Sequence, residues 1–216
     1  MKDVSAFYDT IADEYDAHYI RPTDVAEDQL TSVILDRHIR PGTKVLDVGC
    51  GTGHTLTMTQ PTHYTGIDIS SKMLLKAKHR WPGRTFLRYD MDDLSSAVHR
   101  RKSFDVVTCL NGVGLYAKDY PKLVEGMCMV ARNSVILSVP LPAHKRRHRL
   151  TAESPGKSYM SRSEIVEPFK RTFDNVEVTT YSSAWIDRMP QLWLDRFGVG
   201  CPWWLKPYYI IVEATV

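Results

Sequence analysis

The chain has 216 residues, and its 28 Lys and Arg residues against 25 Asp and Glu residues give a formal net charge of +3. This length supports one domain with a full hydrophobic core and leaves no room for a second large domain, so we expect a single domain over residues 1–216. The small net charge says little about partners, except where basic residues cluster.

The sequence shows no signal for a membrane or for an oxidising compartment. No apolar run approaches the roughly 20 residues that a transmembrane helix needs, and residues 1–16 are too acidic for a secretory signal. Cys50, Cys109, Cys128 and Cys201 lack C-x-x-C spacing, which indicates reduced thiols instead of a zinc site or a disulfide framework. We therefore expect a cytoplasmic protein without membrane contact and without a bound metal.

The first segment, residues 7–19, alternates aromatic and acidic residues at nearly helical spacing. Tyr8, Tyr15 and Tyr19 fall close to one face of such a helix, and packing of that face on the core is the simple interpretation. His18 lies in the same segment and is either a solvated histidine or part of a site.

The next elements are a helix and a strand. Apolar residues at helical intervals predict a helix over residues 26–39, which Pro41 and Gly42 end. Residues 44–48 then form a short apolar run typical of a strand buried on both faces of a parallel sheet. Asp47 interrupts this run, and its burial requires hydrogen-bond donors or a cationic ligand.

The loop after this strand has three possible interpretations. It matches one of two nucleotide-binding patterns, or it is a plain turn that binds nothing. Gly49, Gly51 and Gly53 remove the Cβ atoms that would keep a ligand away from the main chain. The dinucleotide fingerprint would need Gly or Ala at position 54, which is His54. The string D-V-G-C-G-T-G instead resembles motif I of the class I S-adenosylmethionine-dependent methyltransferases. This resemblance implies S-adenosylmethionine as cofactor and contacts to it from Asp47, Gly49, Cys50, Gly51 and Gly53.

The N-terminal segment also resembles this family, through the Y-D-x-x-A-x-x-Y-D opening of many of its small-molecule enzymes. The resemblance implies a lid helix within about residues 1–25 that covers the cofactor. Tyr8, Tyr15 and Tyr19 would then contact the substrate, an interpretation compatible with packing because a lid helix also packs.

Acidic residues end the next two predicted strands. Residues 64–69 close on Asp68, about twenty residues after the glycines, where nucleotide-binding βαβ units place an acceptor for ribose hydroxyls. Ser70 is expected to cap the following helix. The string G-I-D-I-S resembles the family's motif II, which implies contacts to the cofactor from Ile69, beside the adenine, and from Met73.

The third strand, residues 85–89, ends at Asp90 and Met91, which match the family positions that hold the adenine amino group. Asp92 and Asp93 are equally suited to cap a helix.

The fourth strand, residues 104–110, leads into Asn111, which we expect to border the methionine portion of the cofactor and the acceptor. Many related enzymes carry paired histidines or an acid near Tyr116, and this chain has neither. Asn111, Tyr116 and His18 are the catalytic candidates. A neutral amine acceptor requires little beyond alignment with the methyl–sulfur bond. A hydroxyl acceptor requires a base, and His18, Tyr116 and His144 remain open for that role.

The second half of the chain contains a basic run, residues 144–149, after a strand at residues 134–139. These charges are either solvated, or bind an anionic substrate through residues such as His144, or contact a nucleic-acid backbone. The modest net charge and the lack of a known binding module argue against nucleic acid but leave it open.

The remaining elements are a capped helix at residues 161–170, interrupted near Pro168, and strands at residues 176–181 and 208–215. Between the two strands lies an aromatic insertion, residues 182–207, which contains four tryptophans. Such density favours a cover over the core or an oligomer contact, as in a homodimer, over a substrate wall.

The alternation of strands and helices predicts an α/β fold. The resemblance implies a Rossmann-like, doubly wound and mostly parallel sheet of about seven strands in the order 3-2-1-4-5-7-6. The leading hypothesis is a methyltransferase that acts on N or O of a small-molecule acceptor. The alternatives are a methyltransferase for RNA, peptide or protein, and a protein that binds the cofactor without transferring its methyl group.

Overall fold

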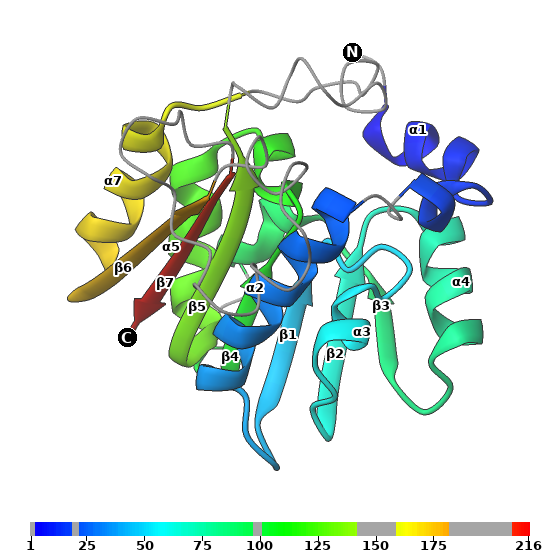
Figure 1. The fold of residues 1–216 in the computed structure, drawn as a ribbon, viewed down its shortest axis with the longest axis horizontal. Helices are drawn as coiled ribbons and strands as arrows, with labels where there is room; N and C mark the ends of the chain where they lie inside the picture. The colour runs from blue at the N-terminus through cyan, green and yellow to red at the C-terminus, as the bar shows by residue number, and fades with distance from the viewer. Residues whose placement is uncertain (1–2, 19–21, 97–100, 142–158, 182–208) are drawn as a thin grey trace.

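The computed structural model describes residues 3–18, 22–96, 101–141, 159–181 and 209–216. The described strands form one seven-stranded sheet in the order β3-β2-β1-β4-β5-β7-β6, which confirms the expected order (Figure 1). The strands are β1 (Lys44–Val48), β2 (His63–Asp68), β3 (Thr85–Arg88), β4 (Phe104–Cys109), β5 (Ala131–Pro140), β6 (Asn175–Tyr181) and β7 (Tyr209–Thr215). Strands β1 to β5 pair in parallel, and β7 is antiparallel to both β5 and β6.

Helices cover both faces of the sheet. The α-helices are α1 (Val4–Ile11), α2 (Pro22–His38), α3 (Thr55–Met58), α4 (Ser71–Arg80), α5 (Tyr120–Val130) and α7 (Arg162–Thr172). The 3-10 helices among the described residues are η1 (Tyr15–His18), η2 (Met91–Ser96) and η4 (Val113–Tyr116). Among the described helices, none combines the length and apolarity needed to cross a bilayer.

Alternating side chains of the strands point into two hydrophobic cores, one on each face of the sheet. Leu46 and Val48 of β1 face the core that includes α5 and α7. Val45 faces the other core, which includes α2, α3 and α4. Because side chains alternate along a strand, Asp47 points to the same face as Val45. The sheet is therefore buried on both faces, as its apolar central strands predict.

Caps define where the helices begin. Ser70 accepts a hydrogen bond from Met73 N at the start of α4, as expected from the sequence. Ser161 and Glu164 form a reciprocal capping box at the start of α7. The expected interruption near Pro168 is wrong, because α7 continues through it to Thr172. The N-terminal segment divides into α1 and η1 instead of forming one helix.

The packing of α5 on η2 yields a stability prediction. A Cβ atom at Gly126 would lie 2.7 Å from the backbone N of Ser95 and 3.0 Å from the carbonyl carbon of Leu94. The Gly126→Ala variant should therefore lose about 1–3 kcal/mol of unfolding free energy by overpacking, despite the better helix propensity of alanine. The measurement is urea unfolding. Glu125→Ala, at the exposed neighbouring position, is the control and should stay within about 0.5 kcal/mol.

Candidate functional site

A cavity of about 440 Å³ opens at the carboxyl ends of β1, β2, β3 and β4, beneath α1. The strand order reverses at β1, which pairs with β2 on one side and β4 on the other. Ligands of open α/β sheets bind at such a switch point. Figure 1 shows α1 above this edge and beside α4.

The glycine loop forms the floor of the cavity and keeps its main chain accessible. Gly49 has φ +71°, and a Cβ there would lie 2.1 Å from Cγ1 of Val113. Gly51 has φ +52°, and a Cβ there would meet nothing closer than Cε1 of Tyr15 at 3.9 Å. Both positions therefore favour glycine, and the backbone at Gly51 faces open space beneath the N-terminal segment.

Asp68 joins the loop to the start of α4. One carboxylate oxygen accepts a hydrogen bond from Gly51 N at 2.9 Å, and the other accepts one from Ser70 N at 2.8 Å. Burial raises the pKa of this carboxyl, and the two N–H donors partly oppose that shift. Each oxygen retains a second lone pair, and Asp68 lines the cavity.

A second acidic group lines the wall beyond β3. Asp90 Oδ1 accepts a hydrogen bond from Asp92 N at 3.0 Å. Asp92 accepts one from Lys118 N at 2.9 Å, and its other oxygen lies 3.2 Å from Lys118 Nζ. The carboxylate of Asp92 raises the pKa of Lys118. This ion pair holds Asp92 and Lys118 together and places Asp90 Oδ2 at 3.9 Å from the same ammonium group.

Aromatic side chains close the cavity from above. The Tyr8 hydroxyl of α1 donates to the Tyr116 hydroxyl of η4 at 2.9 Å. The Tyr8 ring packs edge-to-face on Tyr15 and on Tyr116, with centroids 6.1 and 5.8 Å apart. The N-terminal segment therefore contributes a wall of the cavity through Tyr8 and Tyr15.

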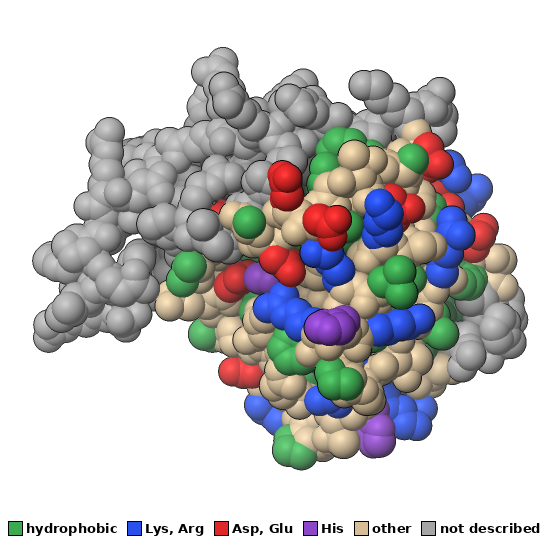
Figure 2. Space-filling model, turned by 90° about the vertical axis from the view of Figure 1, so that its right-hand side faces the viewer, with side chains coloured by type: hydrophobic (Ala, Val, Ile, Leu, Met, Phe, Trp, Pro, Cys, Tyr) green, Lys and Arg blue, Asp and Glu red, His purple; other side chains and the backbone are tan. Residues whose placement is uncertain are grey.

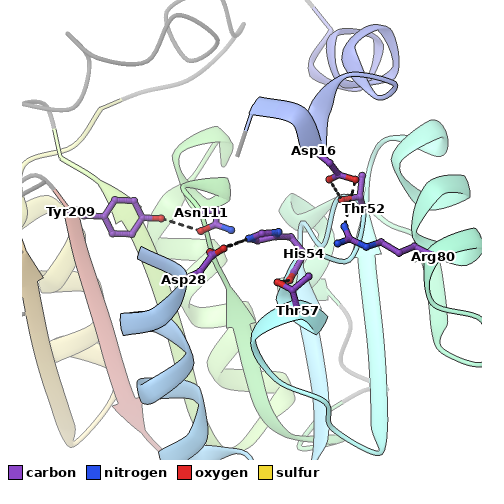
Figure 3. A network of polar contacts seen from close by, with 8 residues as sticks. All are labelled: Asp16, Asp28, Thr52, His54, Thr57, Arg80, Asn111 and Tyr209. Carbon is purple, nitrogen blue, oxygen red and sulfur yellow. Dashed lines mark hydrogen bonds and ion pairs between the residues drawn. The ribbon is translucent and has the colours of Figure 1, made fainter. Parts of the chain in front are cut away.

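Carboxylates of the same N-terminal segment attach it to the site. Asp9 accepts hydrogen bonds from Ser70 Oγ at 2.6 Å and from Lys72 N at 3.0 Å. Asp16 accepts one from Thr52 Oγ1 at 2.6 Å and lies 3.5 Å from Arg80 (Figure 3). Each tyrosine of the two Tyr-Asp pairs thus faces the cavity, while the following aspartate holds the segment to α4 or the glycine loop.

Acidic and basic side chains are interspersed over this face of the molecule, as Figure 2 shows. Lys76 of α4 lies 3.4 Å from the carboxylate of Asp13, between the contacts of Asp9 and Asp16. Asp9, Asp13 and Asp16 therefore contact successive positions from the start to the end of α4, in the same order along the chain.

The charge inside the cavity is predominantly negative. Among the described lining residues, Asp3, Asp68, Asp90 and Asp92 are acidic and Lys118 is basic. Such a cavity favours a ligand with a positive centre and several hydroxyl or amino donors.

Comparison with known proteins shows which family the central part of the chain resembles. Residues 45–134 match the family model described as a methyltransferase domain, which covers the glycine loop and the strand ends at Asp68 and Asp90. Over these residues the chain is similar to this family, and its sheet has the strand order of the class I S-adenosylmethionine-dependent methyltransferases. The cofactor of this class is S-adenosylmethionine, whose sulfonium group is a positive centre and whose adenosine carries hydroxyl and amino donors, so the residues present fit it.

Solved methyltransferases share the fold over nearly the whole chain. An S-adenosylmethionine-dependent methyltransferase of Thermotoga maritima has a TM-score of 0.70 at 14% identity and covers 99% of both chains. Magnesium protoporphyrin IX methyltransferase of Synechocystis, solved with bound SAH, has a TM-score of 0.65 at 19% identity, covering 98% of this chain and 97% of that one. At these identities the likeness concerns the fold.

Curated relatives match over shorter stretches. Phosphoethanolamine N-methyltransferase 1 of Zea mays is 32% identical over 92 residues, which are 41% of this chain and 18% of the maize protein. Trans-aconitate 2-methyltransferase of Deinococcus radiodurans is 32% identical over 121 residues, 52% of this chain and 44% of that protein. This chain thus spans less than half the length of either relative.

Most residues expected at the methyltransferase cofactor line the cavity. These are Gly49, Gly51, Asp68, Ile69, Met73, Asp90, Met91 and Asn111. Tyr116, a catalytic candidate, and Tyr8 and Tyr15, the substrate candidates on the N-terminal segment, line it as well.

Three expected cofactor residues lie away from the described lining of the cavity. Asp47 is 2% exposed, and its two oxygens accept hydrogen bonds from Tyr64 Oη at 2.6 Å and Thr108 Oγ1 at 2.8 Å. Cys50 packs into the core against Gly66, and a Cβ at Gly53 would meet the Trp81 ring at 2.7 Å. The side chains of Asp47 and Cys50 therefore point into the protein beneath the loop, and Gly53 lies close to the Trp81 ring.

Other predicted residues fall outside what the structure describes. These are Tyr19, His144 with the basic run 144–149, and the aromatic insertion 182–207. His18 ends η1, and its side chain is likewise outside the described part.

The structure adds six lining residues that were not among the predicted site residues. They are Asp3, Val4, Tyr89, Asp92, Val113 and Lys118. Asp92 carried a signal, since it follows Asp90 at a strand end, but a helix cap explained it equally well. Lys118 precedes the helix start at Asp119 without any pattern, and its approach to Asp92 depends on the packing of two loops.

The attachment of the N-terminal segment predicts a local stability effect. Hydrogen bonds from the Ser70 hydroxyl and Lys72 N lower the pKa of Asp9, so the contact is present at neutral pH and is lost as pH falls through the acid range. Asp9→Ala should raise hydrogen-exchange rates of α1 amides roughly fivefold, the equivalent of about 1 kcal/mol for a lost capping carboxylate. Asp13→Ala, whose carboxylate is 89% exposed, is the control and should change them little. Equal rates in the two variants would contradict this role for Asp9.

The raised pKa of Asp68 predicts proton release on cofactor binding. Ribose hydroxyl donors and a positive centre favour the charged carboxylate, so binding should lower the pKa that burial raises. Affinity for S-adenosylmethionine should then increase with pH through the acid range, by at most about tenfold per pH unit for one proton, and level off above it. Calorimetry in buffers of different ionisation enthalpy measures the released protons. Asp68→Asn should remove the pH dependence, and a flat profile for the unaltered chain would refute the assignment.

Proposed function

We propose that this methyltransferase transfers a methyl group from S-adenosylmethionine to N or O of a small-molecule acceptor. The observation that carries the proposal is the cavity itself, in which the glycine loop, Asp68 and Asp90 lie at adjoining strand ends beneath aromatic side chains. The family match and the fold support the donor, and the enclosing N-terminal segment supports an acceptor small enough to lie beneath it.

The cofactor would lie across the strand ends in the order of the sheet. Asp90 and Met91, after β3, would hold the adenine, and Asp68, at the end of β2, would accept hydrogen bonds from the ribose hydroxyls. The backbone of Gly51 after β1 would contact the middle of the cofactor, since it has no Cβ to prevent approach. Asn111 after β4 would border the methionine portion. Ile69 would flank the adenine, and Met73 would add a further apolar contact to the cofactor.

The reaction requires alignment more than it requires a strong base. When bound, the sulfonium group supplies an activated methyl group and a neutral leaving group. Tyr8, Tyr15 and Tyr116 would exclude water and confine the acceptor near Asn111, which lowers the barrier by restricting orientation. An amine that arrives neutral would need no further group. For a hydroxyl acceptor a base would be needed, and Tyr116 is the candidate for that role that lies in the described lining, where it would have to act as the phenolate.

The names of the relatives support a small acceptor. The maize relative is named for phosphoethanolamine and the Deinococcus relative for trans-aconitate, which are small molecules of different chemistry. The Synechocystis neighbour is named for magnesium protoporphyrin IX. These names support the class of acceptor, while their diversity leaves its identity to experiment.

Substitution of Asp68 tests the cofactor assignment. Asp68→Ala should weaken binding of S-adenosylmethionine roughly ten- to hundredfold, since hydrogen bonds to a charged group contribute about 1.5–3 kcal/mol. Calorimetric titration measures this, with NAD as the comparison ligand and Asp13→Ala as the matched surface control. Equal binding of NAD and S-adenosylmethionine, or an unchanged affinity in Asp68→Ala, would contradict the assignment.

An acceptor screen tests the reaction. The unaltered chain is incubated with methyl-labelled S-adenosylmethionine and with separate metabolite, RNA and protein fractions. Label in the metabolite fraction supports the proposal. Label confined to RNA or protein would overturn the small-molecule acceptor, and cofactor binding without transfer to any fraction would overturn the enzymatic role.

A further inference from the structure

Asn111, Ser138 and Tyr209 form a closed ring of hydrogen bonds at the β4 side of the cavity. Asn111 N donates to Ser138 Oγ at 2.9 Å, and Tyr209 Oη donates to Asn111 Oδ1 at 3.4 Å (Figure 3). Ser138 Oγ and Tyr209 Oη lie 3.3 Å apart. Because the single hydroxyl proton of Tyr209 goes to Asn111, the Ser138 hydroxyl is the donor in this last contact.

The two partners of Asn111 are fixed by the sheet. Ser138 on β5 is 0% exposed and Tyr209 on β7 is 2% exposed, while Asn111 lines the cavity. The antiparallel pairing of β5 with β7 places Ser138 opposite Ile211, and Tyr209 lies two residues before Ile211 on the same strand. The ring is therefore a buried anchor that reaches the cavity at one point, the carboxamide of Asn111.

The backbone of Asn111 also depends on this anchor. Its φ of +57° is in the left-handed region, which is sparsely populated for residues other than glycine. The Asn111 N–H bond to Ser138 Oγ and the Gly112 N–H bond to the Ser138 carbonyl at 2.9 Å hold this turn. Such backbone persists where its surroundings over-determine it, often at functional sites.

The ring also decides which atom the carboxamide presents. Asn111 Oδ1 faces Tyr209, so Nδ2 lies on the opposite side of the amide group, as Figure 3 shows. With Oδ1 engaged by Tyr209, the amide group that Asn111 has left to offer a ligand is the donor Nδ2, whereas Asp3, Asp68, Asp90 and Asp92 in the cavity lining offer acceptors. Lys118, the basic residue among the described lining, is engaged by Asp92 on the β3 side.

We propose that Ser138 and Tyr209 are positioning residues that hold Asn111 as a hydrogen-bond donor to the methionine carboxylate of the cofactor. The inference rests on the proposed function. With adenine at the end of β3 and ribose at the end of β2, the sheet order brings the methionine portion toward β4 and Asn111. A carboxylate there requires donors, and an N–H bond to an ionised oxygen is among the stronger hydrogen bonds.

A double-mutant cycle tests the coupling, with S-adenosylhomocysteine and 5′-methylthioadenosine as calorimetric probes. The second probe keeps the adenosine and lacks the carboxylate. Tyr209→Phe should lower the affinity for S-adenosylhomocysteine about tenfold in the unaltered background. It should have no effect on this affinity in an Asn111→Ala background, since contacting residues are energetically coupled. Affinity for 5′-methylthioadenosine should stay unchanged in all four proteins. Ser138→Ala should behave as Tyr209→Phe does.

Two further variants separate positioning from a structural effect. Tyr120→Phe removes another buried tyrosine hydroxyl, which donates to the Ile165 carbonyl, and should leave both affinities unchanged. Asn111→Asp keeps the size of the side chain but replaces the donor by a negative acceptor. Asn111→Asp should lower the affinity for S-adenosylhomocysteine more than Asn111→Ala does, and it should leave the affinity for 5′-methylthioadenosine unchanged.

The outcomes distinguish this inference from the proposed function. Equal losses from Tyr209→Phe in both backgrounds, or equal losses for both probes, would show that Tyr209 acts through the fold and would overturn the inference. Full affinity in Asn111→Asp would overturn the donor role. Failure of the unaltered chain to bind either probe would overturn the proposed function, and the inference with it.

Discussion

The carboxylate of Asp68 is the contact on which the rest of the site depends. Its two oxygens join Gly51 N of the loop to Ser70 N at the start of α4, so one side chain sets the distance between the loop and that helix. Ser70 in turn donates to Asp9, which holds the N-terminal segment. The floor and the cover of the cavity are therefore connected through three neighbouring groups, and a ligand at Asp68 would stabilise both.

Asp47 and Asp68 end adjacent parallel strands, yet they serve different purposes. Tyr64 and Thr108 occupy the oxygens of Asp47, and its burial leaves it no described position on the cavity. Asp68 receives main-chain donors alone and keeps lone pairs toward the cavity. Burial raises the pKa of both carboxyls. The energetic cost of two nearby buried carboxylates is offset by the hydroxyl donors of Tyr64 and Thr108 at Asp47 and by the main-chain donors of Gly51 and Ser70 at Asp68.

The sequence predicts what local patterns encode. Short apolar runs indicated the strands, and the rule that ligands bind at the carboxyl ends of parallel strands brought the acids after β2 and β3 to one site. The sheet order followed from resemblance, because β7 pairs with β5 across residues far apart in the chain. The partners of Asp47 lie 17 and 61 residues away, and those of Asn111 lie 27 and 98 residues away. The spacing of residues within a short segment cannot predict contacts between residues so far apart in the chain.

A polar row crosses the otherwise apolar face of the sheet beneath α2. Asp47, Thr108, Ser138 and Tyr209 belong to neighbouring strands β1, β4, β5 and β7, and each is hydrogen-bonded near the cavity end. Apolar side chains at these positions would pack at lower cost, so the row is unfavourable for stability alone. It supplies fixed orientations for the glycine loop and Asn111, which apolar packing does not. The site therefore takes its fixed geometry from buried polar contacts, while the N-terminal segment is held over the cavity by more exposed carboxylates such as those of Asp13 and Asp16.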